Sequence, residues 1–410
     1  MAEVAVLGAG FIGLSAAYWL MRDGHRVILF DPLGPGEATS YGNAGTFAQY
    51  GCIPVNNPDV FRNLPRFLFS STSPLRIRWQ YLPHIAPWLV RFLLAARAKR
   101  YEHSAKALAN LLARAFDGYR EMLASGQLSS FVQRRECLYL YSNANSFHAA
   151  QPSLALRRSL GVRFETLDRD GVHHLEPNLA PIFAYGTIFN DSWYLSDPHG
   201  FLQTLYASLT SQGLRHERTA IRTLAPSTSG VRLIDETGRS YAAEYAIVCT
   251  GALSGRLARQ CGDSVPLDTE RGYHVRFPGM SRLISRPCGW SERGFYMVPM
   301  HDGIRAAGTV ELGGYGSQKN PKLLRLISTS AQQALPQLQQ PDSSWLGFRP
   351  SLPDGLPVVG PSSASPRVIY AFGHQHLGVT LGGVTGSIVA DIVAGRVPPV
   401  DLEAYSPRRF

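Results

Sequence analysis

Three glycines and one aspartate near the start of the chain have the types and spacing of a nucleotide-binding site. Gly8, Gly10 and Gly13 match the pattern GxGxxG, and Asp31 follows the last of them after 18 residues. The first glycine makes a tight turn, the second lets a pyrophosphate approach the backbone, and the third lets helix and strand pack closely. A carboxylate after the next strand binds a ribose and repels a 2′-phosphate. The spacing predicts a dinucleotide site; the alternative is a tight turn without a ligand.

Three later segments favour FAD over NAD, which binds to the same pattern. Thr39–Gly45 (TSYGNAG) supplies hydroxyls and flexible backbone for a long ligand, and Tyr245–Gly251 (YAIVCTG) predicts a second strand that ends on a glycine. Gly373–Gly378 (GHQHLG) begins the last helix, whose positive N-terminal end suits a reduced, anionic flavin. The alternative for this last segment is a helix start whose glycines serve packing alone.

These residues need regular elements to position them. The apolar pattern predicts a buried strand at Val4–Leu7, a helix at Ile12–Arg22 and a second parallel strand at Val27–Phe30. Asp197 followed by a proline predicts the N-terminus of a helix at Asp197–Leu209. Further strands are predicted at Glu136–Tyr141, Thr219–Leu224, Gly230–Asp235, Ser240–Cys249, His274–Phe277, Phe295–Pro299 and Ile304–Gly308, and further helices between Val60 and about Leu123 and at Gly378–Ala394.

The composition limits the class of protein. With 410 residues and an apolar fraction of 45%, the chain is globular and long enough for two interleaved domains. It has no run of about 18 uninterrupted apolar residues, so no transmembrane helix is expected, and its N-terminus lacks the features of a signal peptide. Five cysteines without a CxxC pair suit buried thiols in a reducing compartment. We therefore expect a cytoplasmic protein.

Several motifs together resemble the D-amino-acid oxidase-like family of FAD oxidoreductases, especially its D-amino-acid dehydrogenase branch. They are GAGFIG, TSYGNAG, RGYHVRFPG, GIRAAGTVEL, and above all GFRP, PDGLPVVG and GHQHLGVTLGG in that order. The resemblance covers nearly the whole chain. It implies an α/β fold in which a Rossmann-like FAD-binding domain joins a second, mixed-sheet α+β substrate domain. The expected ranges are 1-50, 144-180, 196-258 and 342-410 for the FAD-binding domain and 51-143, 181-195 and 259-341 for the substrate domain.

The resemblance also implies that FAD is bound without a covalent bond. Some relatives attach the flavin through a cysteine near the C-terminal motif, but this chain has no cysteine after Cys288. The residues expected at the cofactor are Gly8, Gly10, Phe11, Ile12, Gly13, Asp31, Pro32, Thr39, Ser40, Asn43, Ala44, Gly45, Thr46, Ile221, Gly251, Gly373, His374, Leu377, Gly378, Val379 and Thr380.

The reaction implied by the resemblance is oxidation of an amine to an imine, with hydride transfer from the substrate Cα to flavin N5. Water then hydrolyses the imine to a 2-oxo acid and ammonia. Arg349 of the GFRP motif is expected to bind the substrate carboxylate, because a guanidinium fork matches a carboxylate and holds its plane. Tyr296 matches a position where relatives often place a tyrosine hydroxyl near that carboxylate. His376, like His374, is a candidate for bonding the flavin or tuning the amine.

Other residues are candidates for the same site. Relatives place the equivalents of Arg271 and Tyr273 beside the active face, and those of Thr46, Gln49 and Tyr50 near the flavin or the substrate. Nothing in the spacing of Glu270 and Glu311 supports a paired acid and base. No metal-ligand cluster and no Ser-His-Asp order stands out in the sequence, so we expect no metal and no covalent nucleophile.

The leading functional hypothesis is an FAD-dependent D-amino-acid dehydrogenase that passes electrons to a quinone or another acceptor. Three alternatives stay open at this point. They are a dehydrogenase of D-hydroxyproline or another cyclic imino acid, an O2-using amine oxidase of the glycine or sarcosine type with the same fold, and a non-catalytic subunit that only holds FAD within a larger complex.

Residues 60–101 form a basic, aromatic segment. They include eight Arg or Lys and no Asp or Glu, interleaved with Trp, Tyr and Leu. Such a segment suits the surface of an anionic membrane, and peripheral contact with the inner face of the cell membrane would serve a dehydrogenase that reduces a quinone. The alternative is a helical lid on the substrate domain. The net charge of +10 is concentrated here, so we do not expect nucleic-acid binding.

Overall fold

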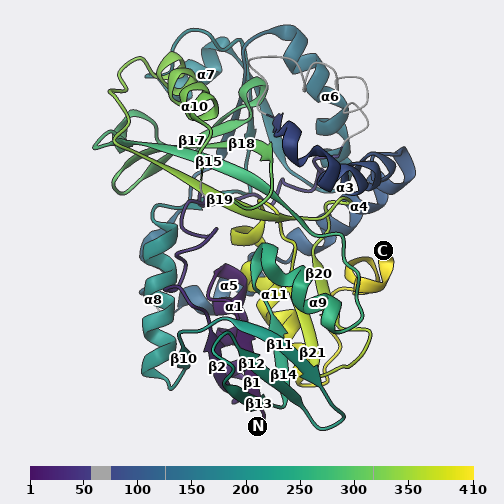
Figure 1. The fold of residues 1–410 in the computed structure, drawn as a ribbon. Helices are drawn as coiled ribbons and strands as arrows, with labels where there is room; N and C mark the ends of the chain where they lie inside the picture. The colour runs from purple at the N-terminus through teal and green to yellow at the C-terminus, as the bar shows by residue number, and fades with distance from the viewer. Residues whose placement is uncertain (57–74, 125, 317) are drawn as a thin grey trace.

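Two large sheets organise the chain in the computed structural model, which describes residues 1–56, 75–124, 126–316 and 318–410. The smaller sheet lies in the lower half of Figure 1 and the larger sheet in the upper half. The described helices are α1 (Phe11–Arg22), α3 (Leu82–Ala95), α4 (Ala98–Leu112), α5 (Asp117–Ala124), α6 (Ala144–Ser159), α7 (Arg169–Leu175), α8 (Pro198–Ser211), α9 (Ser254–Gln260), α10 (Pro321–Ala334) and α11 (Gly378–Val393).

The smaller sheet has six strands, in the order β10 (Arg215–Glu217), β2 (Arg26–Phe30), β1 (Glu3–Leu7), β14 (Tyr245–Val248), β21 (Val368–Phe372) and β20 (Val358–Pro361). All are parallel except β20, which pairs antiparallel with β21. Alternate residues of a strand point to opposite faces. Val4 and Val6 accordingly pack into one core with α1, α8 and α11, while Ala5 and Leu7 pack into another.

A small antiparallel sheet forms much of that second core. Its strands are β11 (Ile221–Pro226), β12 (Val231–Asp235) and β13 (Ser240–Ala243). Together with α9 they cover the face of the six-stranded sheet opposite α1 and α11. Covered on both faces, β1 is buried along four of its five residues, which explains its continuous apolar sequence.

The larger sheet has nine strands. Its main path runs β19 (Ser343–Ser351), β15 (Asp268–Pro278), β18 (Gly303–Leu312), β17 (Phe295–Met300), β16 (Cys288–Trp290), β6 (Cys137–Tyr141), β8 (Tyr185–Phe189) and β7 (Phe164–Asp168), and β4 (Leu75–Ile77) pairs with β18. One face packs against α10 through residues such as Tyr273, Val275 and Phe277. The opposite face is turned toward the smaller sheet. A third, three-stranded sheet joins β3 (Thr46–Phe47), β9 (Trp193–Leu195) and β5 (Val132–Gln133).

The predicted α/β fold with a parallel sheet and a second mixed sheet is confirmed. The opening strand, helix and strand agree with the prediction to within a residue or so, and the Asp197 side chain caps α8 by accepting from the Gly200 N–H at 2.9 Å. The single strand predicted at Ser240–Cys249 is wrong. The chain there forms β13 and β14, because it leaves the small antiparallel sheet and enters the parallel one.

The basic segment also differs from its prediction. Residues 57–74 lie outside the described residues, so the helical prediction there is not tested. Leu75–Ile77, predicted as helix, is the strand β4, because it adds in parallel to the end of β18. The remainder does form α3, α4 and α5. In the described part of the chain, no helix is both long and apolar enough to cross a bilayer.

Two strands bear on the predicted division into domains. β7 lies within the range 144-180 and β19 within 342-410, and both ranges were assigned to the FAD-binding domain. In the structure, β7 pairs with β8 and β19 pairs with β15, so both belong to the nine-stranded sheet. Their partners lie far away in the sequence, and the pattern of apolar residues carries no information about which sheet a strand joins.

Candidate functional site

The glycine turn is built by close packing between β1, α1 and β14. Gly8 has φ of 110°, and a Cβ there would lie 2.4 Å from the carbonyl oxygen of Cys249. A Cβ on Gly13 would lie 1.8 Å from the carbonyl oxygen of Gly8. Both glycines are therefore required by the backbone itself. Gly10 is different, because a Cβ there would meet only the Ser40 side chain, at 3.0 Å.

The helix that follows presents free N–H groups. In the described structure α1 has no side-chain hydrogen bond at its N-cap, and its first turn contains no acidic residue. The Phe11 N–H donates to Ser40 Oγ at 3.3 Å. Asp31 accepts from the N–H groups of Ala9 and Leu33, both at 2.8 Å, and so ties β2 to the turn. Burial raises the pKa of Asp31, and these two hydrogen bonds oppose that rise.

The segment predicted to follow the cofactor bridges the two large sheets. Thr39 Oγ1 donates to the Phe348 carbonyl at 2.9 Å, and the Arg305 guanidinium donates to the Asn43 carbonyl at 2.7 Å. His274 Nδ1 lies 3.1 Å from the Gly42 carbonyl. Three contacts from strands β19, β18 and β15 thus hold residues 39–43 against the larger sheet. A ligand that extends from the glycine turn along this segment would therefore reach that sheet.

The loop before α11 approaches the same region. Gly373 has φ of 85° and Gln375 has φ of 49°, a conformation that costs energy in a residue with a side chain. The Gln375 N–H donates to the Pro350 carbonyl at 3.0 Å, and this contact fixes the loop to β19. At the start of α11, Thr380 Oγ1 accepts from the Ala48 N–H at 3.0 Å. The loop is therefore held at both ends.

The two histidines of that loop have different surroundings. His374 is buried, and its Nε2 lies 3.0 Å from Thr385 Oγ1 of α11. His376 lines a cavity. Burial lowers the pKa of His374 to about 3. Surrounding protein atoms and the nearby Arg349 lower the pKa of His376 to about 4, although His376 is exposed to solvent in this structure. Both imidazoles are therefore neutral near pH 7.

A cavity of about 290 Å³ lies where the bridging segment, the loop before α11 and the larger sheet meet. It gathers residues from distant parts of the chain. Its lining is Thr39, Gly42, Asn43, Ala44, Thr46, Ala48, Tyr50, Gly51, Ile53, Val55, Tyr139, Arg157, Glu270, Gly272, Tyr273, Gly294, Tyr296, Ala307, Gly308, Thr309, Val310, Trp345, Gly347, Arg349, Gln375 and His376.

The register of the larger sheet explains which side chains reach this cavity. Directly opposed residues share a face, and the β15–β19 ladder opposes Glu270 to Arg349, Gly272 to Gly347 and His274 to Trp345. The glycine pair makes room for the flanking side chains, since a Cβ on Gly347 would lie 1.8 Å from the Trp345 ring. A Cβ on Gly272 would lie 2.4 Å from the guanidinium carbon of Arg349, so the arginine side chain lies directly across this glycine.

Arg349 is held but not neutralised by an ion pair. Its Nη1 donates to the Thr309 carbonyl at 2.9 Å, and in the described chain no carboxylate oxygen lies within ion-pair distance of it. Thr309 has φ of 58°, and it and Gln375 are the two residues other than glycine with positive φ in the described structure. Both line the cavity, as expected where backbone strain serves a site.

Among the described residues that line this cavity, Glu270 is the one with a carboxyl group. Burial raises its pKa, and the nearby Arg349 opposes that rise. Burial also lowers the pKa of the Arg349 guanidinium, and Glu270 counters that effect. Glu270 therefore favours the charged form of Arg349 without forming an ion pair with it in the described structure.

Tyr296 lies in a cluster of tyrosines. Its hydroxyl is hydrogen-bonded to that of Tyr139, and the rings of Tyr139 and Tyr50 meet edge to face at 5.5 Å. The structure makes room for Tyr296 with Gly289, where a Cβ would lie 2.9 Å from the Tyr296 ring. Burial raises the pKa of Tyr296 well above its ordinary value, so the hydroxyl stays protonated. The cluster supplies hydrogen-bond donors and acceptors at one end of the cavity.

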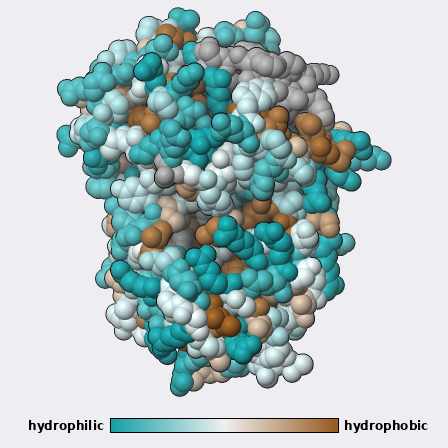
Figure 2. Space-filling view, viewed as in Figure 1, coloured by the Kyte–Doolittle hydropathy of each residue, from teal (hydrophilic) through white to brown (hydrophobic). Residues whose placement is uncertain are grey.

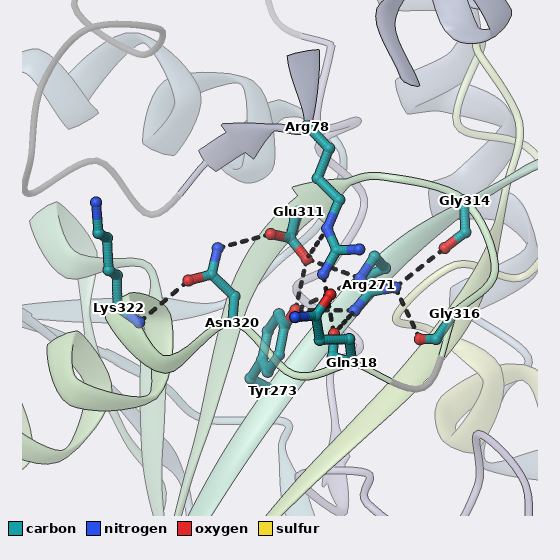
Figure 3. Close-up of polar contacts among 9 residues, drawn as sticks. All are labelled: Arg78, Arg271, Tyr273, Glu311, Gly314, Gly316, Gln318, Asn320 and Lys322. Carbon is teal, nitrogen blue, oxygen red and sulfur yellow. Dashed lines mark hydrogen bonds and ion pairs between the residues drawn. The ribbon is translucent and has the colours of Figure 1, made fainter. Parts of the chain in front are cut away.

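Arg271 is turned away from the cavity, contrary to the idea that it contacts a substrate. It alternates with Glu270 and Gly272, so it points to the opposite face of β15. Figure 3 shows its guanidinium between Glu311 and the loop after β18, where it donates to Glu311 at 2.7 Å and to the Gly316 carbonyl at 2.8 Å. The Tyr273 hydroxyl also donates to Glu311. This buried group positions the loop and leaves substrate binding to other residues.

Some predicted cofactor residues lie away from the cavity. Ile221 packs into the core on the far side of the six-stranded sheet, and Pro32 is exposed after β2. Conversely, three residues that line the cavity were not predicted from the sequence. They are Tyr139 of β6, Arg157 of α6 and Trp345 of β19. No spacing pattern marks them, because their position depends on strand order and on the placement of α6.

A family model described as "FAD dependent oxidoreductase" (DAO) matches residues 3–392. The chain belongs to this family. It is 34% identical to a D-amino-acid oxidase of Bradyrhizobium diazoefficiens over 100% of this chain and 99% of that protein. It is 29% identical to a D-amino acid dehydrogenase of Paramagnetospirillum magneticum, again over 100% and 99%. Among solved structures, glycine oxidase from Geobacillus kaustophilus has a TM-score of 0.79 at 21% identity, covering 100% of this chain and 99% of that one, which shows a common fold.

The residues present fit FAD, the cofactor of this FAD-dependent oxidoreductase family. The N-terminus of α1 suits a diphosphate, since its N-cap residue provides no side-chain cap, only the Phe11 N–H is bonded to a side chain among the described residues, and the helix dipole favours negative charge. Gly10 lacks the Cβ that would stand between backbone and ligand. Asp31 keeps lone pairs beyond its two backbone bonds for ribose hydroxyls. At the other end, α11 begins at Gly378 without a side-chain cap, next to the cavity.

A Gly10→Ala variant of this FAD-dependent oxidoreductase is expected to bind FAD at least about tenfold more weakly, because one extra methyl group in a filled site costs about 1–3 kcal/mol. Titration of apoprotein with FAD, followed by flavin fluorescence, measures the affinity. Gly255→Ala in α9 is the matched control, since its new Cβ would make only ordinary contact with Leu267 at 3.5 Å. Equal affinities in both variants would contradict the assignment of Gly10.

Proposed function

We propose that this chain is an FAD-dependent D-amino-acid dehydrogenase, in which the six-stranded half binds FAD and the nine-stranded half binds the substrate. The observation that carries the proposal is Arg349, a partly buried guanidinium in the cavity that is fixed by one carbonyl and lacks a carboxylate partner in the described structure. A partly buried cation without a carboxylate partner favours an anionic ligand. The names of the relatives support an amino acid as that ligand.

In this proposal, FAD and the residues of the cavity have the following roles. FAD, when bound, supplies the hydride acceptor for oxidation at the substrate Cα. Arg349 donates two N–H groups to the substrate carboxylate and fixes its plane. The pKa of His376 is lowered, in part by the nearby Arg349, so His376 adds no second positive charge beside the substrate amine. The walls of the cavity hold the substrate in one orientation, and orientation is the main contribution that the protein makes to such a reaction.

We propose that FAD is bound without a covalent bond to the protein. No cysteine is among the residues that line the cavity. All five cysteines are buried, and burial raises the pKa of Cys52, Cys137, Cys249, Cys261 and Cys288, which suppresses the reactive thiolate. Release of intact FAD on acid precipitation of the protein tests this point.

The experiment that tests the proposed function is anaerobic reduction of the bound flavin by a panel of D- and L-amino acids, sarcosine and hydroxyprolines. Bleaching of the flavin absorbance by D-amino acids and not by their L-enantiomers is the expected result. Bleaching by sarcosine alone would favour an amine oxidase of the glycine type. A flavin that no compound in the panel reduces would overturn the proposal.

The identity of the electron acceptor is tested by reoxidation of the reduced flavin. A quinone is the proposed acceptor, and the names of the D-amino acid dehydrogenases among the relatives support an acceptor other than O2. The rival is O2, which the name of the 34% identical D-amino-acid oxidase favours. Stopped-flow mixing of the reduced enzyme with air-saturated buffer or with a soluble quinone separates the two. Rapid reoxidation by air would overturn the dehydrogenase proposal.

Peripheral contact with an anionic membrane is proposed for the surface around α3. Figure 2 shows apolar side chains gathered at the upper right, where Figure 1 places α3. Trp79 and Val90 are exposed by 58% and 56%, and Arg91 lies on the same helix and is also exposed. The enzyme is expected to sediment with anionic liposomes at low salt and to be released at high salt. Protein that stays in the supernatant at low salt would refute this contact.

A further inference from the structure

A second arginine lines the cavity from α6. Arg157 Nε donates to the Tyr50 carbonyl at 3.0 Å, and its Nη1 donates to Ser153 Oγ at 3.2 Å. Its guanidinium carbon lies 5.6 Å from the centre of the Phe189 ring. A backbone carbonyl, a side chain on its own helix and an aromatic ring therefore hold this cation in place. A side chain restrained in this way loses little entropy when it binds a ligand.

Arg157, like Arg349 and Arg305, has no ion pair in the described structure, unlike the buried Arg271 and Arg286. Arg271 pairs with Glu311, and Arg286 pairs with Glu136 and Glu176. Within the described residues no carboxylate oxygen lies within 4.0 Å of Arg157, and its Nη2 has no hydrogen-bond partner there. Fixed but unpaired, the guanidinium has donors left for an anion.

The two arginines of the cavity have unequal surroundings. Arg349 has Glu270 as its cross-strand neighbour, and Glu270 is the one carboxyl group among the described residues of the lining. The end formed by Arg157 has none. It has instead the hydroxyl-bearing side chains of Tyr50, Tyr139 and Tyr296. Cations and hydroxyl groups without a carboxylate are the donor set of a carboxylate-binding subsite.

We propose that the cavity selects amino acids whose side chain carries a second carboxylate, with Arg349 binding the α-carboxylate and Arg157 binding the side-chain carboxylate. This inference rests on the proposed function and names its substrate class as acidic D-amino acids. The uncharged amides of the same shape, D-glutamine and D-asparagine, leave the Arg157 donors without an anion. Groups that lose a charged partner discriminate strongly between such close analogues.

Matched substrate pairs test the proposal in the holoenzyme. The value of kcat/KM for flavin reduction is expected to be at least about thirtyfold higher for the better of D-glutamate and D-aspartate than for its amide. In Arg157→Gln this ratio is expected to fall to about one, and in Arg157→Lys, which keeps the charge but not the fork, to take an intermediate value. Arg158→Gln is the matched control, because Arg158 is exposed beside Phe164, outside the cavity lining. Its ratio is expected to equal that of the wild type.

Binding of inert acids gives a readout that needs neither turnover nor a folded variant. Perturbation of the flavin spectrum is expected to show glutarate or succinate binding at least about tenfold more tightly than butyrate. A flavin reduced by neutral D-amino acids as readily as by acidic ones, or equal binding of glutarate, succinate and butyrate, would overturn the inference while leaving the proposed function intact. A flavin that no D-amino acid reduces would instead overturn the proposed function.

Discussion

Replacement of Arg349 by alanine is expected to raise the KM for a D-amino acid at least about tenfold and to lower kcat/KM by about two to three orders of magnitude. The variant removes both N–H groups that bind the substrate carboxylate, and hydrogen bonds to a charged group contribute about 1.5–3 kcal/mol each. It also removes the cation that makes the buried end of the cavity attractive to an anion. Steady-state or anaerobic stopped-flow kinetics of flavin reduction measure both constants.

Two further variants separate a role in binding from a role in folding. Arg349→Lys keeps the charge but cannot hold a carboxylate plane, so its kcat/KM is expected to lie between those of alanine and wild type. Gly272→Ala leaves Arg349 unchanged but places a Cβ 2.4 Å from its guanidinium carbon, and a similar loss is expected because the fork must move. Flavin content and melting temperature are the controls. An unchanged KM in Arg349→Ala would contradict the assignment.

Replacement of Glu311 by glutamine is expected to destabilise the protein by about 3–5 kcal/mol. Arg271 is 0% exposed in its side chain and donates to Glu311 at 2.7 Å, so the variant leaves a buried guanidinium without its counter-ion. The same carboxylate accepts from Asn320 at 2.6 Å and lies 3.3 Å from the Arg78 Nε (Figure 3). Denaturant or thermal unfolding of the holoprotein measures the loss. Glu236→Gln is the matched control.

That control breaks the exposed pair of Glu236 with Arg222, for which a loss of no more than about 1 kcal/mol is expected. The pH dependence gives a second check. Burial acts to raise the pKa of Glu311, but hydrogen bonds from Tyr273 and Asn320 and the nearby arginines hold it below its ordinary value. A lowered pKa contributes stability above the unfolded value, about 4.3, and that contribution is lost as the pH falls. The gap between wild type and Glu311→Gln should therefore narrow in acid, and a gap that is constant down to strongly acid pH would contradict this assignment.

Local pattern was enough to identify the cofactor half of the molecule. Gly8, Gly10, Gly13 and Asp31 lie within one strand–turn–helix–strand unit, so every contact that defines the turn is made between residues close in the sequence. The sequence also shows the glycines of α11, but it does not show why glycine is needed there. A Cβ on Gly386 would lie 2.6 Å from the backbone of Ser15, so this glycine serves the close packing of α11 on α1.

Chemistry at the substrate end depends on long-range pairing. Arg349 was identifiable because its motif is short and contiguous, whereas Arg157 and Tyr139 reach the cavity only because β6 adds to β16 and α6 lies beside Tyr50. Glu270 and Arg271 are adjacent and both charged, and only the pleat and register of β15 decide which one faces the cavity. The sequence by itself determined the family and the cofactor and predicted one residue of the substrate site. The tertiary structure decided which other side chains line the cavity, because strand order and register join residues far apart in the sequence, such as Leu138 and Cys288.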